Sequence, residues 1–272
     1  MTTQTPPAVG RSPRRKRLVS QSIQYVVLVG IVIAIAMAAD WPRLRQNFLN
    51  YDIFVGMLPD LFTVALVNTI IYTVSGYILG FVLGMLLALM RLSSVPLNRW
   101  IARGYIELFR GLPALIVFML LGFGVPTAFP GFALPGGKYG TVALALGLVA
   151  AAYLAETFRA GIQAVPKGQT EAARSLGMPA SRAMATVVLP QAIRVVIPPL
   201  TNELILLFKD SSLVYAIGVT MGTSELAKFG SAEATTQYNS TPLVAAGLTY
   251  LIITVPLSII VGRLEARQAR AK

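Results

Sequence analysis

The stretch EAARSLGMPASRAMATVVLP, residues 171–190, separates two long apolar runs and decides how the chain is organised. It carries charged side chains and a Gly-Met-Pro break, whereas the sequence on either side is apolar enough to lie in lipid. Gly177 is suited to end one short helix, and Pro179 suits the first turn of another. We therefore expect a helical elbow near residues 168–185, with Pro190 beginning the next membrane span.

The elbow is predicted to have two different faces. Ala173, Leu176 and Ala180 recur at spacings of three and four, which on a helix places them together, while Glu171 and Arg174 point elsewhere. One interpretation is an amphipathic helix that lies on lipid headgroups. Because the apolar face is mostly alanine and has no aromatic anchor, we favour a groove in another protein as its partner.

The composition of the chain is that of a membrane protein. Of its 272 residues, 55% are hydrophobic and only 12% are charged, about half the charged fraction of a soluble domain. Several apolar runs have the length of about 20 residues that a helix needs to cross a bilayer. The predicted fold class is therefore an all-α integral membrane protein with six transmembrane helices, near residues 22–40, 60–90, 101–125, 139–161, 188–209 and 242–262.

The distribution of charge predicts an orientation. The chain has 23 basic and 11 acidic residues, a net charge of +12. Most basic residues come before the first span, after the second, between the fourth and fifth, and after the sixth. Since basic loops stay in the cytoplasm, both termini are expected there. Topology thus accounts for the positive charge, and no nucleic acid partner is required.

The first span allows a second interpretation. A basic stretch followed by an apolar run and by AMA at residues 36–38 is also compatible with a cleaved signal peptide. The apolar regions of signal peptides are shorter, however, and the later spans carry their own orientation signals. We therefore favour an additional N-terminal helix.

Gly76, Gly80 and Gly84 share one face of the second span in two overlapping G-x-x-x-G steps. Such faces allow two helices to approach closely. Packing within the chain is the favoured interpretation, and dimerisation through this face is the alternative.

The stretch TNELILLFKDSS, residues 201–212, predicts a polar pathway. Asn202 and Lys209 are seven residues apart, as are Glu203 and Asp210, so all four share about the same helix face. A charge at membrane depth costs about 2.5–3.5 kcal/mol on insertion scales, so it needs an internal or aqueous environment. A zwitterion would present its carboxylate to Lys209 and its ammonium to Asp210 or Glu203. Alternatively, Lys209 and Asp210 lie at the outer water boundary or in a structural pair.

Further polar residues belong to this hypothesis. Ser211 follows the same helix, and Asn68 and Thr69 lie at mid-height of the second span. The last two could equally form hydrogen bonds between helices.

Two pairs with i, i+3 spacing are expected at the inner ends of spans. They are Glu107 with Arg110 and Glu156 with Arg159, and opposite charges at this spacing stabilise a helix. We interpret both pairs as structural or gating contacts.

The elbow also carries a resemblance to a known family. Its order of residues resembles the EAA motif of ABC importer permeases. The matching order is Glu171-Ala172-Ala173, three residues, Gly177, nine residues, Val187, one residue and Leu189-Pro190. Other stretches are similar to the polar amino acid permeases of the histidine, glutamine, glutamate and arginine type, and together the resemblance covers about residues 55–262. These stretches are YIELFRGLPAL (residues 105–115), AYLAETFRAGIQAVPKGQTEAARSLGM (152–178), LPQAIRVVIPPLTNE (189–203) and KDSSLVYAIGV (209–219).

The resemblance implies a type I ABC importer permease fold, with a five-helix core and one extra N-terminal helix, in the bacterial inner membrane. The elbow would be the coupling helix that docks on a cytoplasmic ATPase subunit, through Glu171, Ala172, Ala173 and Gly177. The implied complex holds two permease chains, identical or related, two ATPase subunits and an external amino-acid-binding protein. The segment 211–241 would contain an outer helix that meets that binding protein, and transport would proceed by alternating access.

The implied domains are a basic, disordered tail over residues 1–20 and an extra transmembrane helix with an outer loop over 21–56. The permease domain would follow over 57–262, and a basic cytoplasmic tail over 263–272.

The chain itself lacks the means to hydrolyse ATP. A P-loop needs G-x-x-x-x-G-K followed by Ser or Thr, and the nearest candidate, GFALPGGKYG, fails this spacing and has Tyr139 after Lys138. The sequence has no cysteine and no histidine, so metal sites of the usual kind and thiol or Ser-His catalysis are not expected. We predict a transport subunit without a cofactor or a metal, whose partner ATPase binds ATP and Mg²⁺. The alternatives are a gradient-driven transporter or channel of six helices, and a membrane anchor for a partner enzyme.

Overall fold

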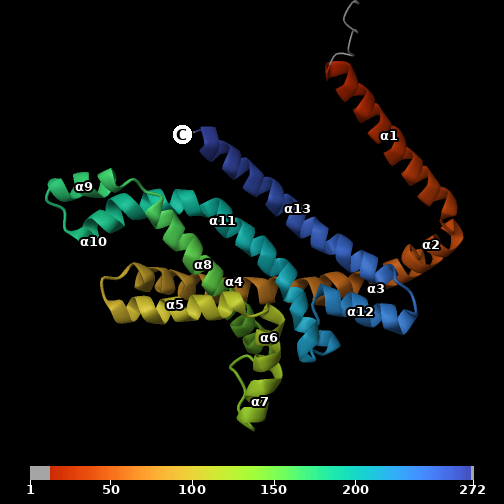
Figure 1. Cartoon of the computed structure of the whole chain (residues 1–272). Coiled ribbons are helices and arrows are strands. Elements are labelled where there is room, and N and C mark those ends of the chain that lie inside the picture. Colours follow the sequence, from red (N-terminus) through yellow and green to blue (C-terminus); the bar gives the residue numbers. More distant parts are fainter. Residues whose placement is uncertain (1–12, 271–272) are drawn as a thin grey trace, which may run out of the picture. The chain divides into compact units, whose positions relative to one another are not determined.

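A computed structural model of the chain describes residues 13–270, with side chains for residues 21–268, and it divides after Leu49 into two compact units. The first unit contains α1 (Pro13–Ala38) and α2 (Trp41–Phe48), shown in Figure 1. The run Gln21–Ala38 has a mean hydropathy of 2.0, and none of its side chains is buried. This is the extra N-terminal helix that the sequence predicts.

The predicted tail over residues 1–20 is partly wrong. Residues 1–12 lie outside the described residues, but residues 13–20 already form the beginning of α1. Pro13 suits the first position of a helix because its φ is fixed in advance and its missing N–H has no partner there anyway. The arginine, lysine and leucine residues that follow are good helix formers, so the helix starts ahead of the apolar run.

Within the second unit, α3 (Tyr51–Asp60), the π-helical turn η1 (Leu61–Ala65) and α4 (Leu66–Leu92) follow one another without a break. Pro59 lies inside α3 and removes one N–H from the backbone hydrogen bonds, and the wider turn η1 comes directly after it. The predicted span 60–90 is therefore helical and extends further toward the N-terminus.

The core of the second unit is the contact between α4 and α8 (Lys138–Gln163). A Cβ atom built on Gly76, Gly80 or Gly84 would lie 2.5, 2.7 or 2.9 Å from the Cβ of Leu146, Ala150 or Leu154, respectively. Such distances are too short for real side chains, so the three glycines allow the helices to touch. The predicted packing of the glycine face within the chain is confirmed.

The third predicted span, residues 101–125, is not one helix. It consists of α5 (Pro96–Gly111), α6 (Ala114–Met119), the π-helical turn η2 (Leu120–Gly124) and α7 (Val125–Ala128), with a bend of 102° between α5 and the rest. Pro113 disfavours a helical conformation of the residue before it, and Leu112 is extended, with φ −88° and ψ 135°. The apolar pattern continues across this point, which is why it predicted a single span.

After α8 the chain forms the short helices α9 (Lys167–Ser175) and α10 (Ala180–Ala183), the π-helical turn η3 (Met184–Val188) and α11 (Leu189–Asp210). Two 3-10 turns, η4 (Ser211–Ile217) and η5 (Met221–Thr223), lead to α12 (Leu226–Gln237). The last helix, α13 (Thr241–Arg270), includes most of the predicted C-terminal tail. The helix expected within residues 211–241 is α12.

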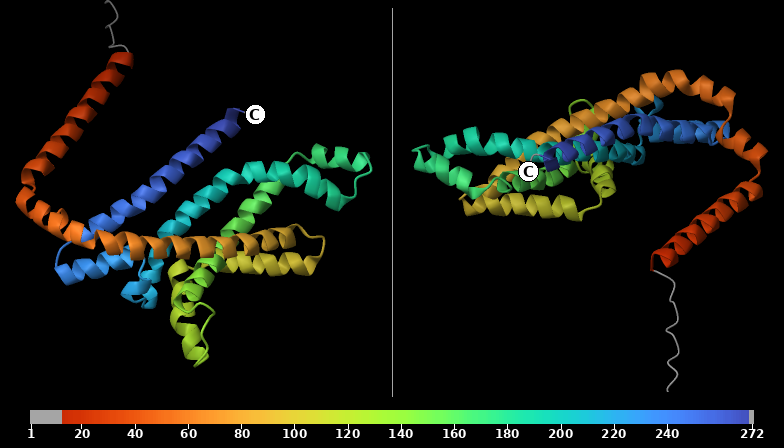
Figure 2. Two further views of the ribbon diagram at one scale, coloured as in Figure 1. Left: turned by 180° about the vertical axis from the view of Figure 1, so that it is seen from behind. Right: turned by 90° about the horizontal axis from the view of Figure 1, so that it is seen from above.

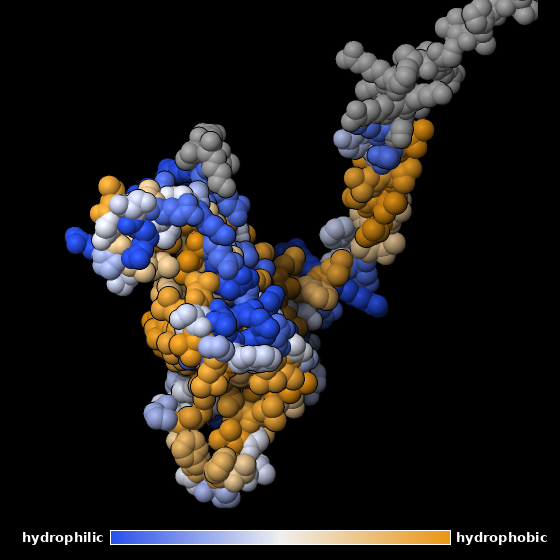
Figure 3. All heavy atoms as spheres, turned by 60° about the vertical axis from the view of Figure 1, so that its left-hand side comes forward, coloured by the Kyte–Doolittle hydropathy of each residue, from blue (hydrophilic) through white to orange (hydrophobic). Residues whose placement is uncertain are grey.

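The second unit has two distinct ends. Figures 1 and 2 show α9, α10 and the connection from α4 to α5 at one end, and α3 and α12 at the opposite end. Hydrophilic residues gather on the face that carries α9 and α10, while hydrophobic residues cover much of the sides (Figure 3). Among the described residues, five helical runs are long and apolar enough to cross a membrane, or six if the bent α5–α7 segment counts as one span.

Candidate functional site

The elbow, residues 168–185, contains a tight turn that glycine makes possible. Gly177 has a φ of +82°, and its N–H donates to the carbonyl of Arg174 at 3.0 Å. The N–H of Met178 donates to the carbonyl of Ala173 at 3.2 Å, which completes a Schellman motif at the end of α9. The predicted roles of Gly177 in ending the first helix and of Pro190 in beginning α11 agree with the structure.

The predicted two-faced arrangement of the elbow is wrong in one respect. Glu171 and Ala172 are exposed, but Ala173 is 5% exposed and packs inside its own chain. Leu176, which the spacing placed on the same face as Ala173, is 81% exposed because α9 ends at Ser175 and the chain turns there. The exposed surface of the turn therefore offers Glu171, Ala172 and the large apolar Leu176.

The elbow is joined firmly to the membrane helices on either side. Only residues 164–166 separate α8 from α9, and Val165 is buried in a small cluster with Val188 and Ala192, against which Ile162 packs. A Cβ on Gly161 would lie 2.0 Å from Cγ1 of Val196, so α8 and α11 also touch directly. The link that precedes α9 is thus packed against η3 and α11, and α8 and α11 are in contact.

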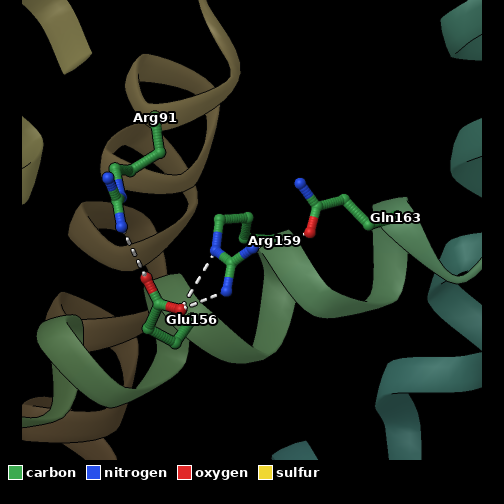
Figure 4. Close-up of polar contacts among 4 residues, drawn as sticks. All are labelled: Arg91, Glu156, Arg159 and Gln163. Atoms are coloured by element: carbon green, nitrogen blue, oxygen red, sulfur yellow. Dashed lines mark hydrogen bonds and ion pairs between the residues drawn. The ribbon is translucent and has the colours of Figure 1, made fainter.

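Charged side chains link α8 to α4 close to the elbow (Figure 4). Glu156 Oε2 accepts hydrogen bonds from Arg159 Nη2 at 2.6 Å and Nε at 3.0 Å, and Arg159 Nη1 donates to Gln163 Oε1 at 2.6 Å. Arg91 Nη2 lies 3.8 Å from Glu156 Oε1. The predicted Glu156–Arg159 pair is therefore present, and it extends to α4.

The other predicted pair is absent. Glu107 and Arg110 form no ion pair among the side chains of residues 21–268. Arg110 instead places its guanidinium over the ring of Tyr153, 5.6 Å from the centroid.

The polar face of α11 lies at the end of that helix. Asn202 and Lys209 are exposed, Glu203 and Asp210 are half-buried, and Ser211 is buried, with its hydroxyl donating to the carbonyl of Phe208 at 2.7 Å. Among the described side chains, the three charged residues of this face form no ion pair. Of the residues predicted for the pathway here, Asn202 and Lys209 are thus the most accessible, and Ser211 is enclosed within the chain.

Asn68 and Thr69 form hydrogen bonds within the chain, which was the alternative to a role in the pathway. Nδ2 of Asn68 donates to the carbonyls of Gly222 and Ser224 at 3.1 and 3.0 Å, and Oδ1 accepts from the Tyr139 hydroxyl at 2.6 Å. Thr69 is fully buried, and its hydroxyl accepts from the N–H of Leu226 at 3.1 Å. In this structure both side chains hold the segment before α12, which folds back against α4. The spacing of residues along the sequence does not reveal this contact.

A buried carboxylate completes this outer segment. Glu225 is fully buried and caps α12, accepting hydrogen bonds from the N–H groups of Ala227 and Lys228 at 2.6 Å each and from the Tyr250 hydroxyl at 2.7 Å. Burial raises the pKa of the Glu225 carboxyl, because it disfavours the charged form more than the three donors favour it. Glutamate is not among the residues preferred at a helix N-cap, so neither this role nor the burial of Glu225 could be read from the sequence.

An acidic surface cavity of about 390 Å³ lies at the same end, between α3 and α12. Its lining includes the carboxylates of Asp52, Asp60 and Glu233. Within residues 21–268, no group of three carboxylates lies close enough together to hold a metal ion. The cavity is a negatively charged surface feature at this end of the second unit.

Comparisons with known proteins agree with these features. The family described as binding-protein-dependent transport system inner membrane component matches residues 80–270. The probable glutamine ABC transporter permease protein GlnM of Bacillus subtilis is 41% identical over 180 residues, which is 66% of this chain and 80% of that protein. The arginine transport system permease protein ArgU of Corynebacterium glutamicum is 35% identical over 244 residues, 86% of this chain and 76% of that protein.

A solved structure gives the same result. The crystal structure of an amino acid ABC transporter with histidines aligns with a TM-score of 0.71 and 33% identity, covering 80% of this chain and 98% of that one. These matches favour an ABC importer subunit over a gradient-driven transporter or an anchor. The chain therefore belongs to the inner-membrane permeases of binding-protein-dependent transport systems, as the transmembrane transport subunit of an ABC importer for polar amino acids.

Proposed function

We propose that the elbow is the element through which a cytoplasmic ATPase drives this permease. The observation that carries the proposal is the exposed turn held by Gly177, which presents Glu171 and Leu176 on an elbow whose base packs against α11 through Val165. Leu176 would fill an apolar groove of the ATPase and Glu171 would bind a basic residue at its rim. The partner binds ATP and Mg²⁺, and this chain contributes no cofactor.

The complete importer contains two permease chains, identical or related, and two ATPase subunits. The elbow faces the cytoplasm together with both termini, in a bacterial inner membrane. This orientation is supported by the basic residues that follow α4 and surround α9 and α10, since positive loops are retained in the cytoplasm.

An extracytoplasmic amino-acid-binding protein docks at the opposite end. The acidic cavity beside α12 supports this assignment, because carboxylates at a surface attract basic residues of a partner.

The substrate is a polar amino acid, with glutamate, glutamine or a basic amino acid as the candidates. The relatives compared here are described as carrying glutamine and arginine. Lys209 faces the substrate carboxylate, and Asp210 or Glu203 faces its ammonium, as the transport cycle opens the pathway first to one side of the membrane and then to the other. The absence of ion pairs among these three side chains supports their role in binding.

The test is reconstitution of the permease with its ATPase and binding protein in liposomes. Wild-type protein is expected to take up amino acid only when ATP and loaded binding protein are both present. Glu171→Lys should abolish uptake while the permease remains folded in the membrane. Glu265→Lys, at an exposed position of α13, serves as the matched control for expression and insertion. Uptake that persists without ATP, or that survives Glu171→Lys, would refute the proposal.

A further inference from the structure

The ion pair between Arg91 and Glu156 differs in kind from the others in the described chain. Of the three ion pairs among residues 21–268, two join residues three positions apart, namely Asp40 with Arg43 and Glu156 with Arg159. Arg91 and Glu156 join α4 to α8. The side chains are only 19% and 21% exposed, so water screens this pair weakly.

The contact is incomplete in this structure. Arg159 occupies Glu156 Oε2, so Oε1 is the oxygen that faces Arg91, and 3.8 Å is too long for a hydrogen bond. Among the described residues, neither Glu156 Oε1 nor Arg91 Nε has a hydrogen-bond partner (Figure 4). Because leaving buried charged atoms unpaired is unfavourable, a small shift that closes the gap stabilises the helix pair, and a shift that widens it has the opposite effect.

The position of the pair makes it sensitive to such shifts. Beyond the three glycines, Leu87 and Ala88 of α4 are still buried in clusters that include residues of α8. The last of the glycine contacts is at Gly84, where an added Cβ would meet Leu154 at 2.9 Å. Arg91 lies seven residues beyond it, which is about two helical turns. Arg91 is one residue from the end of α4, so its contact with α8 is farther from the glycine crossing than these contacts and changes most when the angle between the helices changes.

The pair is also connected to the elbow along α8. Arg159 joins Glu156 to Gln163, the last residue of α8, and Val165 packs the following link against Val188 and Ala192. A displacement of α9 therefore reaches Glu156 through one rigid helix.

We infer that Glu156 is a positioning residue for transport, which passes movement of the elbow from α8 to α4 by closing and opening its contact with Arg91. The inference rests on the proposed function, in which an ATPase moves the elbow. Arg159 keeps Glu156 oriented throughout, and the oxygen Oε1 makes the contact that changes.

The experiment compares charge variants in the reconstituted importer with ATPase and binding protein. Glu156→Arg places two arginines against each other, and Arg91→Glu combined with Glu156→Arg restores attraction between the helices. Both variants lose the contact between Glu156 and Arg159 equally, so their comparison isolates the contact between helices. Asp40→Asn is the matched control, because it also removes an i, i+3 ion pair while an amide oxygen can still cap α2.

The readout is the stimulation of ATP hydrolysis by loaded binding protein, together with the amount of assembled complex and the basal hydrolysis. Glu156→Arg is expected to lower the stimulation about tenfold with assembly intact, and the double variant should recover most of it. Glu156→Gln, which removes the attraction to Arg91 without adding a further positive charge, should give an intermediate loss.

Equal stimulation in the single and double charge variants would overturn the inference. Loss of assembly in all three Glu156 variants would also overturn it, by assigning the ion pair to folding. If wild-type permease gives no stimulation, the proposed function itself fails. Normal wild-type stimulation without any difference among the variants rejects only the role of Glu156.

Discussion

At the scale of single residues, Gly177 shows how one backbone angle sets the shape of the elbow. Its φ of +82° is disfavoured for every residue with a Cβ atom, although no atom lies within 4 Å of the position that a Cβ would take. The constraint is therefore conformational and not steric.

Gly177→Ala is expected to destabilise the turn by about 1 kcal/mol and to lower stimulated ATP hydrolysis, because alanine resists the left-handed conformation. Thermal unfolding in detergent and an ATPase assay measure the two effects. Gly104→Ala in α5 is the control, since a Cβ there also meets no atom within 4 Å and alanine favours a helix. Equal effects of the two substitutions would contradict the conformational role.

Glu225 predicts a dependence of stability on pH. Its pKa is raised in the folded protein, so the folded state binds a proton more tightly than the unfolded state. The stability gained from this proton is complete below the ordinary glutamate pKa of about 4.3 and is lost as pH rises through the raised pKa.

Glu225→Gln should unfold more easily by about 1–2 kcal/mol, because an amide cannot accept all three hydrogen bonds of the carboxylate. Its stability should nevertheless change less than that of the wild type between about pH 5 and pH 8. Melting curves at the two pH values test this, and parallel curves for the two proteins would exclude Glu225 as the titrating group.

At the scale of elements, the pairing of α4 with α8 depends on small side chains. Gly80→Val should push the helices apart, since a Cβ would lie 2.7 Å from Ala150 Cβ and 3.2 Å from the carbonyl oxygen of Gly147. We expect a loss of stability of about 1–3 kcal/mol, measured by thermal unfolding. Gly247→Val in α13 meets no atom within 4 Å and should have little effect. Similar losses for both would show that valine itself, and not the contact, is responsible.

Most elements could be predicted from sequence because their signals are local. The length of each apolar run predicts a membrane span, and the spacing of the glycines predicts the face of α4 that packs closely against another helix. Gly177 and Pro190 predict the boundaries of the short helices in the elbow. The bend at Pro113 was missed, since hydropathy is continuous there and a proline within an apolar run is often tolerated in membrane helices.

The sites were harder to predict than the elements, because they depend on contacts between distant parts of the chain. Asn68 lies more than 150 positions from Gly222 and Ser224, to which it donates. Leu176 was assigned to the wrong face, because a helical spacing was extended past the end of α9. Local spacing alone was not sufficient either: Glu156 and Arg159 form the expected pair, whereas Arg110, at the same spacing from Glu107, lies over the ring of Tyr153.

At the scale of the whole molecule, the acidic cavity beside α12 predicts an electrostatic component in docking. Glu233→Lys should weaken binding of the loaded binding protein about tenfold, and the difference from wild type should shrink at high salt. Surface plasmon resonance on permease in nanodiscs measures both. Glu265→Lys, near the far end of α13, is the matched control and should bind normally. Unchanged affinity for Glu233→Lys would place the docking surface elsewhere.

The helix α4 carries constraints at both of its ends. Asn68, Thr69 and the Tyr72 hydroxyl, which donates to Thr223 at 2.7 Å, hold the segment before α12, while Arg91 faces Glu156 at the other end. Between Asn68 and Arg91 the helix rises about 35 Å, somewhat more than the hydrocarbon core of a bilayer, which is about 30 Å thick. One continuous helix therefore connects the segment before α12, at one end of the second unit, to the contact with Glu156 at the other.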